Sequence, residues 1–207
     1  MTIFYLNLVN KKENPSMRAI FILFLFICLT TVFGSEKALS NNIKSQTGIG
    51  QTEIVKQAEI YLQGLDELKA DFVQIAPNGS RLSGVFYLNR PGKLRFEYDG
   101  IEDFVVADGT FIYFYDSEIE SQSHALIDDT LANFLLREDL KLSGDVTVQN
   151  AHQIDDETIL TLVHTQDQEA GALTLIFENE PFYLKEWIVQ DAGDNLTKVS
   201  LSQIERG

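Results

Sequence analysis

From Lys69 onwards, the sequence is a series of short apolar runs separated by turn residues, and this pattern restricts the chain to a mostly antiparallel β fold. The interruptions are Pro77-Asn78-Gly79, Pro91-Gly92, Asp99-Gly100, Asp108-Gly109, Pro181 and Gly193-Asp194. Such residues are typical of hairpin turns. Between them we expect about eleven strands, near 70–76, 81–89, 94–98, 102–107, 110–115, 119–127, 144–150, 158–164, 171–178, 183–191 and 196–204.

The hairpin from Gly84 to Tyr98, which turns at Arg90-Pro91, is the most informative of these runs. Its incoming strand is apolar on both faces, with Gly84, Phe86 and Leu88 on one and Val85 and Tyr87 on the other. On its outgoing strand Leu94, Phe96 and Tyr98 alternate with Arg95 and Glu97, as in a sheet with one apolar side. A cation beside an apolar concave sheet favours a binding cavity over a reaction centre.

Two further strands, 104–107 and 111–115, are also apolar on both faces. One face could then line a cavity while the other packs elsewhere. The alternative, that these are ordinary core strands, remains open from the residues alone.

Two helices are expected beside the sheet. In Thr52 to Leu68 apolar residues recur at spacings of three and four, which predicts an amphipathic helix. Asp128-Asp129 could cap a second, short helix, and its apolar residues are Leu131, Phe134, Leu135 and Leu136. Helices covering one face of a curved sheet give an α+β arrangement.

Residues 1–34 read as a signal peptide, because basic residues precede an apolar run from Ala19 to Phe33 that is short for a bilayer span. The alternative is an uncleaved membrane anchor. The single cysteine, Cys28, lies inside the run, so the mature chain would have no disulfide. Residues 35–50 carry no periodic apolar face and are expected to be a flexible linker.

The mature chain is strongly acidic. The whole sequence has a net charge of −15, and residues 1–34 carry Lys11, Lys12 and Arg18 against Glu13, so the remainder has −15 − 2 = −17. This charge argues against nucleic acid and anionic lipid surfaces as partners, since both favour basic patches. Residues 51–207 are long enough for one domain with a sizeable core.

The sequence contains none of the common catalytic, nucleotide-binding or zinc-protease motifs. His124, His152 and His164 lie on separate expected strands or loops, so no metal site is predicted. We therefore expect a protein that is not an enzyme, with no catalytic residues and no cofactor.

The chain resembles the periplasmic outer-membrane lipoprotein carrier family (LolA-like) over most of Thr52 to Ile204. The helix runs into Phe72-Val73-Gln74, similar to the F-x-Q strand of the family. The Arg90-Pro91 corner, the strand 94–98 and Val105-Val106-Ala107-Asp108-Gly109 follow in the order and spacing of the family. The resemblance implies an incomplete, mostly antiparallel β-barrel of about eleven strands, with helical lid elements over an apolar cavity.

The family's function is carried over as an expectation. The resemblance implies a periplasmic chaperone that shields the acyl chains of lipoproteins and carries them from the inner to the outer membrane. Its partners would be acylated lipoproteins, an inner-membrane lipoprotein release complex and an outer-membrane receptor, with the carrier a monomer. The alternative is an envelope-stress sensor of the same fold that binds lipid or misfolded envelope proteins.

The resemblance also implies which residues form the ligand site. Arg90 would hold the lid shut by hydrogen bonds while the cavity is empty. The other expected ligand-site residues are apolar: Leu62 on the first helix, Phe86 and Leu88 before the corner, and Leu94 and Phe96 after it.

Overall fold

The structure is a computed structural model, and it describes residues 50–207. The expected signal peptide, residues 1–34, and the expected linker up to residue 49 lie outside the described residues. The elements in chain order are α2 (Gln51–Gln63), β1 (Glu67–Ile75), β2 (Arg81–Asn89), β3 (Lys93–Tyr98), β4 (Phe104–Asp108), β5 (Phe111–Asp116), β6 (Ser121–Leu126), the 3₁₀ helix η1 (Ile127–Asp129), α3 (Asn133–Leu136), β7 (Val146–Ile154), β8 (Glu157–His164), β9 (Gly171–Asn179), β10 (Phe182–Asp191) and β11 (Leu196–Arg206).

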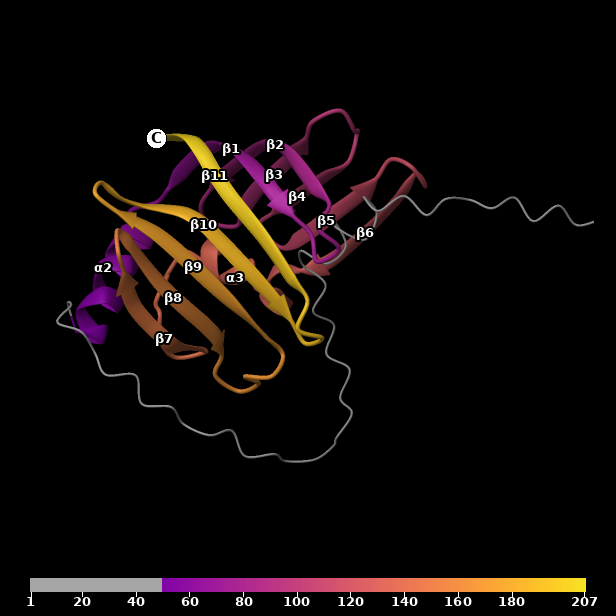
Figure 1. Ribbon diagram of the computed structural model, residues 1–207. Helices are drawn as coiled ribbons and strands as arrows, with labels where there is room; N and C mark the ends of the chain where they lie inside the picture. The colour runs from indigo at the N-terminus through magenta and orange to yellow at the C-terminus, as the bar shows by residue number, and fades with distance from the viewer. Residues whose placement is uncertain (1–49) are drawn as a thin grey trace, which may run out of the picture.

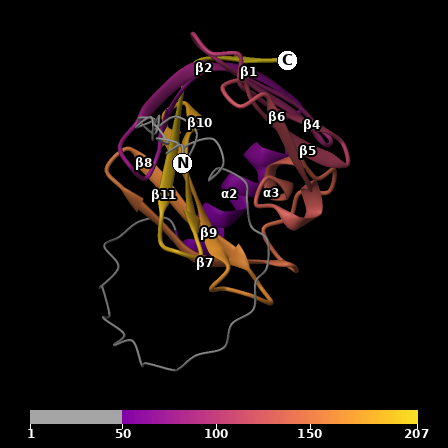
Figure 2. The ribbon, with the colours of Figure 1, turned by 90° about the vertical axis from the view of Figure 1, so that its right-hand side faces the viewer.

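The eleven strands form a single antiparallel sheet in the order β6-β5-β4-β3-β2-β1-β11-β10-β9-β8-β7 (Figure 1). Two meanders, β1 to β6 and β7 to β11, are joined where β1 pairs with β11. The sheet does not close, because β6 and β7 remain its two edges. Figure 2 shows the sheet curving around α2 and α3, which lie on its concave side. The expected α+β, incomplete-barrel fold is thus confirmed.

The alternation of apolar and polar residues along each strand explains which side chains face the core. In β3, Leu94, Phe96 and Tyr98 are buried while Arg95 and Glu97 are exposed, as the alternation predicts. In β2 the even positions Gly84, Phe86 and Leu88 are buried and the odd positions Val85 and Tyr87 are half-buried. The concave face therefore carries the core, and the outer face of this half of the sheet is only partly covered.

One glycine allows the aromatic core to form against β2. A Cβ added at Gly84 would lie 1.8 Å from the Glu97 carbonyl oxygen and 3.0 Å from the Phe72 ring. That space is filled by an aromatic cluster in which Phe72 meets Phe96 edge-on, with ring centroids 5.1 Å apart. The Tyr98 ring also packs edge-on against Phe72, at 5.3 Å.

The first helix is shorter than predicted. We expected it to run from Thr52 to Leu68, but α2 ends at Gln63 and β1 begins at Glu67. The helical spacing of Leu65 and Leu68 misled the prediction, since both are buried from non-helical backbone. Gly64 is the C-cap and its N–H donates to the Ile60 carbonyl oxygen. The helix therefore ends one turn earlier than the spacing of its apolar residues predicts.

The second helix is also different from the prediction. Asp128 and Asp129 do not cap it; they lie within η1, and α3 begins four residues later after Ala132, with no side-chain cap. A Thr130 Oγ1 hydroxyl that donates to the Ile127 carbonyl oxygen closes the η1 turn instead. Residues 127–145, which we call the β6–β7 connection, thus contain two short helical turns rather than one capped helix.

Candidate functional site

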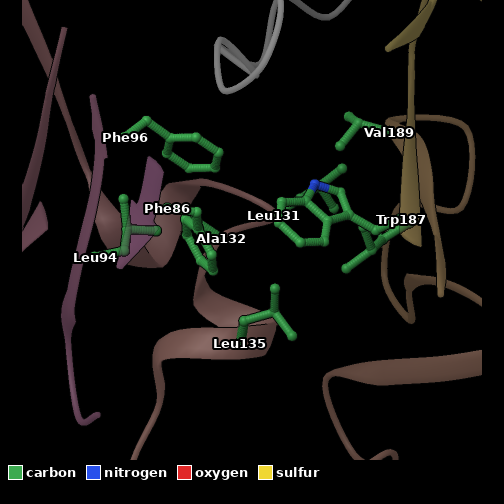
Figure 3. A pocket seen from close by; sticks show the side chains of 9 residues that line it. Phe86, Leu94, Phe96, Leu131, Ala132, Leu135, Trp187 and Val189 are labelled. Carbon is green, nitrogen blue, oxygen red and sulfur yellow. The ribbon is translucent and has the colours of Figure 1, made fainter. Parts of the chain in front are cut away.

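A small apolar cavity lies between the concave face of the sheet and the β6–β7 connection (Figure 3). Nine residues line it. β2 and β3 contribute Phe86, Leu94 and Phe96; the β6–β7 connection contributes Leu131, Ala132 and Leu135; and β9 and β10 contribute Leu173, Trp187 and Val189. All nine are apolar. Such a lining can bind a ligand through hydrophobic burial but offers almost no hydrogen bonds to select its shape.

The cavity is nearly shut. Its volume is about 20 Å³, little more than the space that one water molecule needs. Pockets that hold small molecules measure roughly 300–1,000 Å³. A long apolar ligand can enter only if part of the lining moves. The β6–β7 connection is the part that covers the sheet here, because α2 contributes no lining residue.

Three of the predicted apolar residues, Phe86, Leu94 and Phe96, line this cavity together. Leu88 is buried and pairs across the hairpin with Leu94, but it does not line the cavity. Leu62 is buried on α2 and is also outside the lining. Three of the five predicted apolar residues thus share one cavity, and Leu62 and Leu88 lie outside its lining.

Sequence reasoning did not identify the far wall of the cavity. Trp187 and Val189 were assigned to a strand but not to the site, and Leu173 was not singled out. Trp187 packs edge-on against Phe86 with ring centroids 5.4 Å apart, so the two meanders meet in this wall. The pairing of β1 with β11 brings them together, and no local pattern in the sequence signals that pairing.

Arg90 joins the two helical segments to the hairpin corner. Its Nη1 donates to the Leu62 carbonyl oxygen, in the last turn of α2, and at 3.3 Å to that of Leu65, just after the helix. Its Nη2 donates to the carbonyl oxygens of Arg137 at 2.8 Å and Glu138 at 3.3 Å, just after α3. Carbonyls at helix ends lack intrahelical partners, so a guanidinium is a suitable donor for them.

The backbone of the same corner also holds the β6–β7 connection. The Gly92 N–H donates to the Leu136 carbonyl oxygen at 2.8 Å, so three consecutive carbonyls from residue 136 onwards bind to the corner. Gly92 has a φ of +79°, and a Cβ there would lie 2.7 Å from the Gly109 backbone. Glycine therefore permits the close approach of the β2–β3 and β4–β5 turns.

Arg206, near the end of β11, holds α2 by a separate contact. Its Nη2 donates to the Gly64 carbonyl oxygen at 2.8 Å, and its guanidinium lies over the Tyr61 ring, 4.8 Å from the centroid. None of its recorded contacts reaches the β6–β7 connection. Arg90 thus contacts both helical segments, while Arg206 contacts α2.

The β6–β7 connection has further contacts with α2 and with itself. The Gln63 side-chain amide donates to the Leu140 carbonyl oxygen at 2.9 Å, and the Leu142 N–H donates to the Glu59 carboxylate at 2.8 Å. Arg137 forms an ion pair with Asp145 at 2.8 Å. Burial acts to raise the pKa of Asp145, but the hydrogen bond and charge of Arg137 outweigh it and lower that pKa.

The charge of Arg90 lies in a partly desolvated place. Burial lowers the pKa of its guanidinium, and the neighbouring Asp66 carboxylate opposes that shift. An arginine remains protonated under ordinary conditions, so the bridge is a set of charge-assisted hydrogen bonds at physiological pH.

Within residues 50–207 the structure brings no three His, Cys, Asp or Glu side chains together as a metal site. The rings of His124 and His164 instead contact aromatic neighbours, Phe111 and Phe134 respectively. No helix in this part of the chain is both long and apolar enough to cross a membrane.

Comparison with known proteins shows the family of this chain. Residues 63–207 match the family model described as outer membrane lipoprotein carrier protein LolA. The chain belongs to the LolA family. This family consists of carrier proteins rather than enzymes, which confirms the expectation of a non-enzymatic protein.

Two relatives described as outer-membrane lipoprotein carrier proteins match this chain over most of their length. The outer-membrane lipoprotein carrier protein of Chromohalobacter salexigens is 30% identical over 185 residues, which cover 83% of each chain. That of Nitrosomonas europaea is 24% identical over 193 residues, covering 91% of this chain and 88% of the relative.

Two solved structures also match the chain, at low sequence identity. A LolA superfamily protein from Nitrosomonas europaea has a TM-score of 0.41 at 11% identity, covering 77% of this chain and 94% of its own. MucB in its complex with MucA(peri) has a TM-score of 0.38 at 15% identity, covering 76% of this chain and 56% of its own.

Proposed function

We propose that this LolA family member is a periplasmic chaperone that shields the acyl chains of lipoproteins and carries them from the inner membrane to the outer membrane. The observation that carries this proposal is the wholly apolar cavity beneath a segment whose carbonyls accept hydrogen bonds from Arg90 and Gly92. Under this proposal residues 1–34 are a signal peptide, residues 35–50 are a linker, and residues 51–207 are the carrier domain.

The energetics of lipid transfer explain why such a protein is needed. Moving an acyl chain of about fifteen methylenes into water costs on the order of 12 kcal/mol, at roughly 0.8 kcal/mol for each methylene. A lipoprotein therefore cannot cross an aqueous compartment unaided at a useful rate. A lining of leucine and aromatic side chains offsets most of that cost by burying the acyl chain, and it does not need to recognise the polypeptide attached to the lipid.

The closed cavity explains how the cargo could be released again. In the empty protein the lining residues of the β6–β7 connection pack into the site, so they replace the acyl chains as apolar neighbours of Phe86 and Trp187. Loading must break the hydrogen bonds of Arg90 and Gly92, and this cost lowers the net affinity for lipid. A carrier that binds too tightly could not pass its cargo on.

The proposed ligand-site roles follow from these contacts. Phe86, Leu94 and Phe96 would touch the acyl chains directly. Leu88 would support Leu94 from the adjacent strand, and Leu62 would serve through its carbonyl as a partner of Arg90. Arg90 would stabilise the closed, empty state. The donor would be an inner-membrane lipoprotein release complex, with an outer-membrane receptor as acceptor.

A release experiment tests the proposal. Inner-membrane vesicles carrying a radiolabelled acylated lipoprotein are incubated with ATP and the purified protein, and the soluble fraction is assayed for a complex. We expect soluble lipoprotein in proportion to added protein, and none when the acylated cysteine is replaced by serine. Lipoprotein that stays on the vesicles, or soluble complexes that also form with the non-acylated form, would refute the carrier role. Co-purification of free lipid with a non-acylated regulator would favour the sensor.

A further inference from the structure

β6 is an edge strand without the protective features that edge strands usually carry. It is the last strand of the sheet and pairs only with β5, over six consecutive residues with no bulge. Its sequence, Ser-Gln-Ser-His-Ala-Leu, has no lysine, glutamate, aspartate or proline. Edge strands are commonly protected by charge, proline or a bulge because their free backbone groups can pair with another chain. The opposite edge, β7, has a bulge and contacts α2.

The free hydrogen-bonding groups of β6 can be assigned from the ladder. The Ile127 N–H donates to the Thr110 carbonyl oxygen at 3.0 Å, so residue 127 faces β5. Because donors alternate along an antiparallel strand, Ser121, Ser123 and Ala125 also face β5. Gln122, His124 and Leu126 then direct their N–H and C=O groups away from the sheet. Among the described residues, no recorded hydrogen bond occupies these groups.

The side chains beside this edge suit an added strand. On the outer face, Tyr113 lies opposite His124 and Phe111 lies opposite Leu126, whose side chain is 45% exposed. Phe104 and Tyr115 stack behind them with ring centroids 5.1 Å apart. The aromatic residues on this outer face explain why the sequences of β4 and β5 are apolar on both faces. On the inner face β6 presents only small side chains, serine, serine and alanine, which leave room for larger neighbours.

The start of β6 adds an electrostatic preference. The β5–β6 turn carries Glu118 and Glu120, and no ion pair is recorded for either within residues 50–207. Ile119 between them is 50% exposed. The Asp103 carboxylate accepts hydrogen bonds from the Ser117 N–H and hydroxyl, so the β3–β4 loop holds this turn in place. A fixed, uncompensated acidic turn favours a basic neighbour.

The end of β6 leads to the segment that covers the cavity. A groove of about 380 Å³ lies there, lined by Leu126 and Ile127, by the Pro91-Gly92 and Gly109-Thr110 turns, and by residues of the β6–β7 connection that include Arg137 and Glu138. These last two residues supply the carbonyls that Arg90 binds. One end of a chain bound along β6 would therefore lie next to the Arg90 bridge.

We propose that β6 is a docking edge for an extended peptide of a partner protein, bound as a twelfth strand antiparallel to β6. The peptide would alternate apolar and polar side chains and carry basic residues at its C-terminal end, which an antiparallel strand places against Glu118 and Glu120. Main-chain bonds to residues 122, 124 and 126 would supply the affinity. A second copy of this acidic chain is disfavoured as the occupant because it would bring a like net charge. This docking role does not depend on the lipid-carrier proposal.

Hydrogen exchange on the unmodified protein tests the open edge first. At low protein concentration we expect the amides of Gln122, His124 and Leu126 to exchange at least a hundredfold faster than those of Ser123 and Ala125. Protection of all five amides at low concentration would overturn the proposal, because the edge would then be covered. Protection that grows with protein concentration, together with a dimer in sedimentation, would also overturn it in favour of self-association.

Peptide binding then tests the partner's chemistry. The probe is a fluorescent, amidated octapeptide of alternating valine and threonine that ends in two lysines, and the control peptide ends in two glutamates. We expect the lysine peptide to bind at least tenfold more tightly and to protect the amides of residues 122, 124 and 126. Equal binding of the two peptides, protection elsewhere, or no binding of either would overturn the proposal.

A proline variant separates backbone pairing from side-chain contact. His124→Pro removes an outward N–H without removing a bond to β5, whereas His124→Ala removes the side chain and keeps the N–H. We expect at least tenfold weaker peptide binding for the proline variant and less than threefold for the alanine variant. Equal effects would overturn the edge-pairing geometry. Both variants are checked for an unchanged unfolding midpoint, and the exchange test above stands if the proline variant does not fold.

Discussion

Arg90 binds four carbonyl oxygens that lie 25 to 48 residues away along the chain. The Arg-Pro corner itself could be identified from the sequence through its family resemblance. Its partners could not, because they are backbone carbonyls whose residue types carry no signal. Leu62 was predicted as an apolar site residue, yet the structure uses its carbonyl oxygen. At the residue scale, sequence thus predicted the donor but not the acceptors.

Replacing Arg90 should loosen the closed state. Arg90→Leu removes all four hydrogen bonds. A hydrogen bond to a charged group has a net value of about 1.5–3 kcal/mol, and water can replace part of these partly exposed bonds, so we expect a loss of roughly 2 kcal/mol. We expect a lower free energy of unfolding in urea, normal or increased loading with lipoprotein, and slower release to acceptor membranes.

Arg206→Leu provides the matched control for that variant. It removes a similar hydrogen bond to an α2 carbonyl and a ring contact, but it leaves the β6–β7 connection fastened to the corner. We expect a smaller loss of stability, because one side-chain hydrogen bond is lost rather than four, together with normal release. If both variants release lipoprotein equally slowly, general destabilisation and not the Arg90 bridge is responsible.

The ion pair between Arg137 and Asp145 should make the β6–β7 connection sensitive to acid. The pKa of Asp145 is lowered in the folded state, so its stabilising contribution is complete above the unfolded value near 3.9 and is lost as pH falls through the lowered value. Both side chains are partly exposed, so the effect should remain below about 1 kcal/mol.

Asp145→Asn measures that contribution. We expect the variant to be slightly less stable than the wild type at pH 7 in urea unfolding, and the difference to disappear near pH 2. A difference that persists unchanged at pH 2 would show that the carboxylate charge is not its source.

At the scale of elements, periodicity predicted strands better than helices. All eleven strands were placed within a few residues of their observed bounds. Alternating apolar residues and turn residues are local signals, and they mark each strand and the strand that follows it. The end of α2 was misplaced because Leu65 and Leu68 keep helical spacing although their backbone has left the helix. The η1 and α3 turns depend on contacts with the β2–β3 corner, and no local rule predicts those.

Gly84 tests how tightly the β2–β3 hairpin is packed. An added Cβ would lie 1.8 Å from a backbone oxygen of β3, which only a shift of the strands could relieve. We expect Gly84→Ala to lower the free energy of unfolding by about 2–4 kcal/mol, a range reached by overpacked core sites.

Gly64→Ala is a suitable comparison because a Cβ at Gly64 meets only carbonyl oxygens at 3.6 and 3.8 Å, and its φ of −84° suits any residue. Its effect on unfolding should stay below about 1 kcal/mol. A stability loss as small for Gly84→Ala would mean that the hairpin adjusts more easily than the close approach of β2 and β3 implies.

For the whole molecule, the sequence predicted an apolar cavity but not that it would be almost filled. Strands that are apolar on both faces suggested a cavity in the sheet. Apolar spacing predicted the two helices, and the resemblance to lipoprotein carriers implied that helical elements form a lid over the cavity. The closed state depends on how Leu131 and Leu135 of the β6–β7 connection fit against the sheet residues that line the cavity. Such fit arises from three separate parts of the chain and only a structure can show it.

The most direct test of the central claim is site-specific photo-crosslinking inside living cells. A photoreactive phenylalanine analogue is placed at Leu135, which lines the cavity, and at Ile154, which is exposed on β7, as the control. The account predicts crosslinks from residue 135 to acylated lipoproteins, and none from residue 154 or to lipoproteins whose acylated cysteine is replaced by serine. Crosslinks that are equal at both positions, or that persist without acylation, would contradict it.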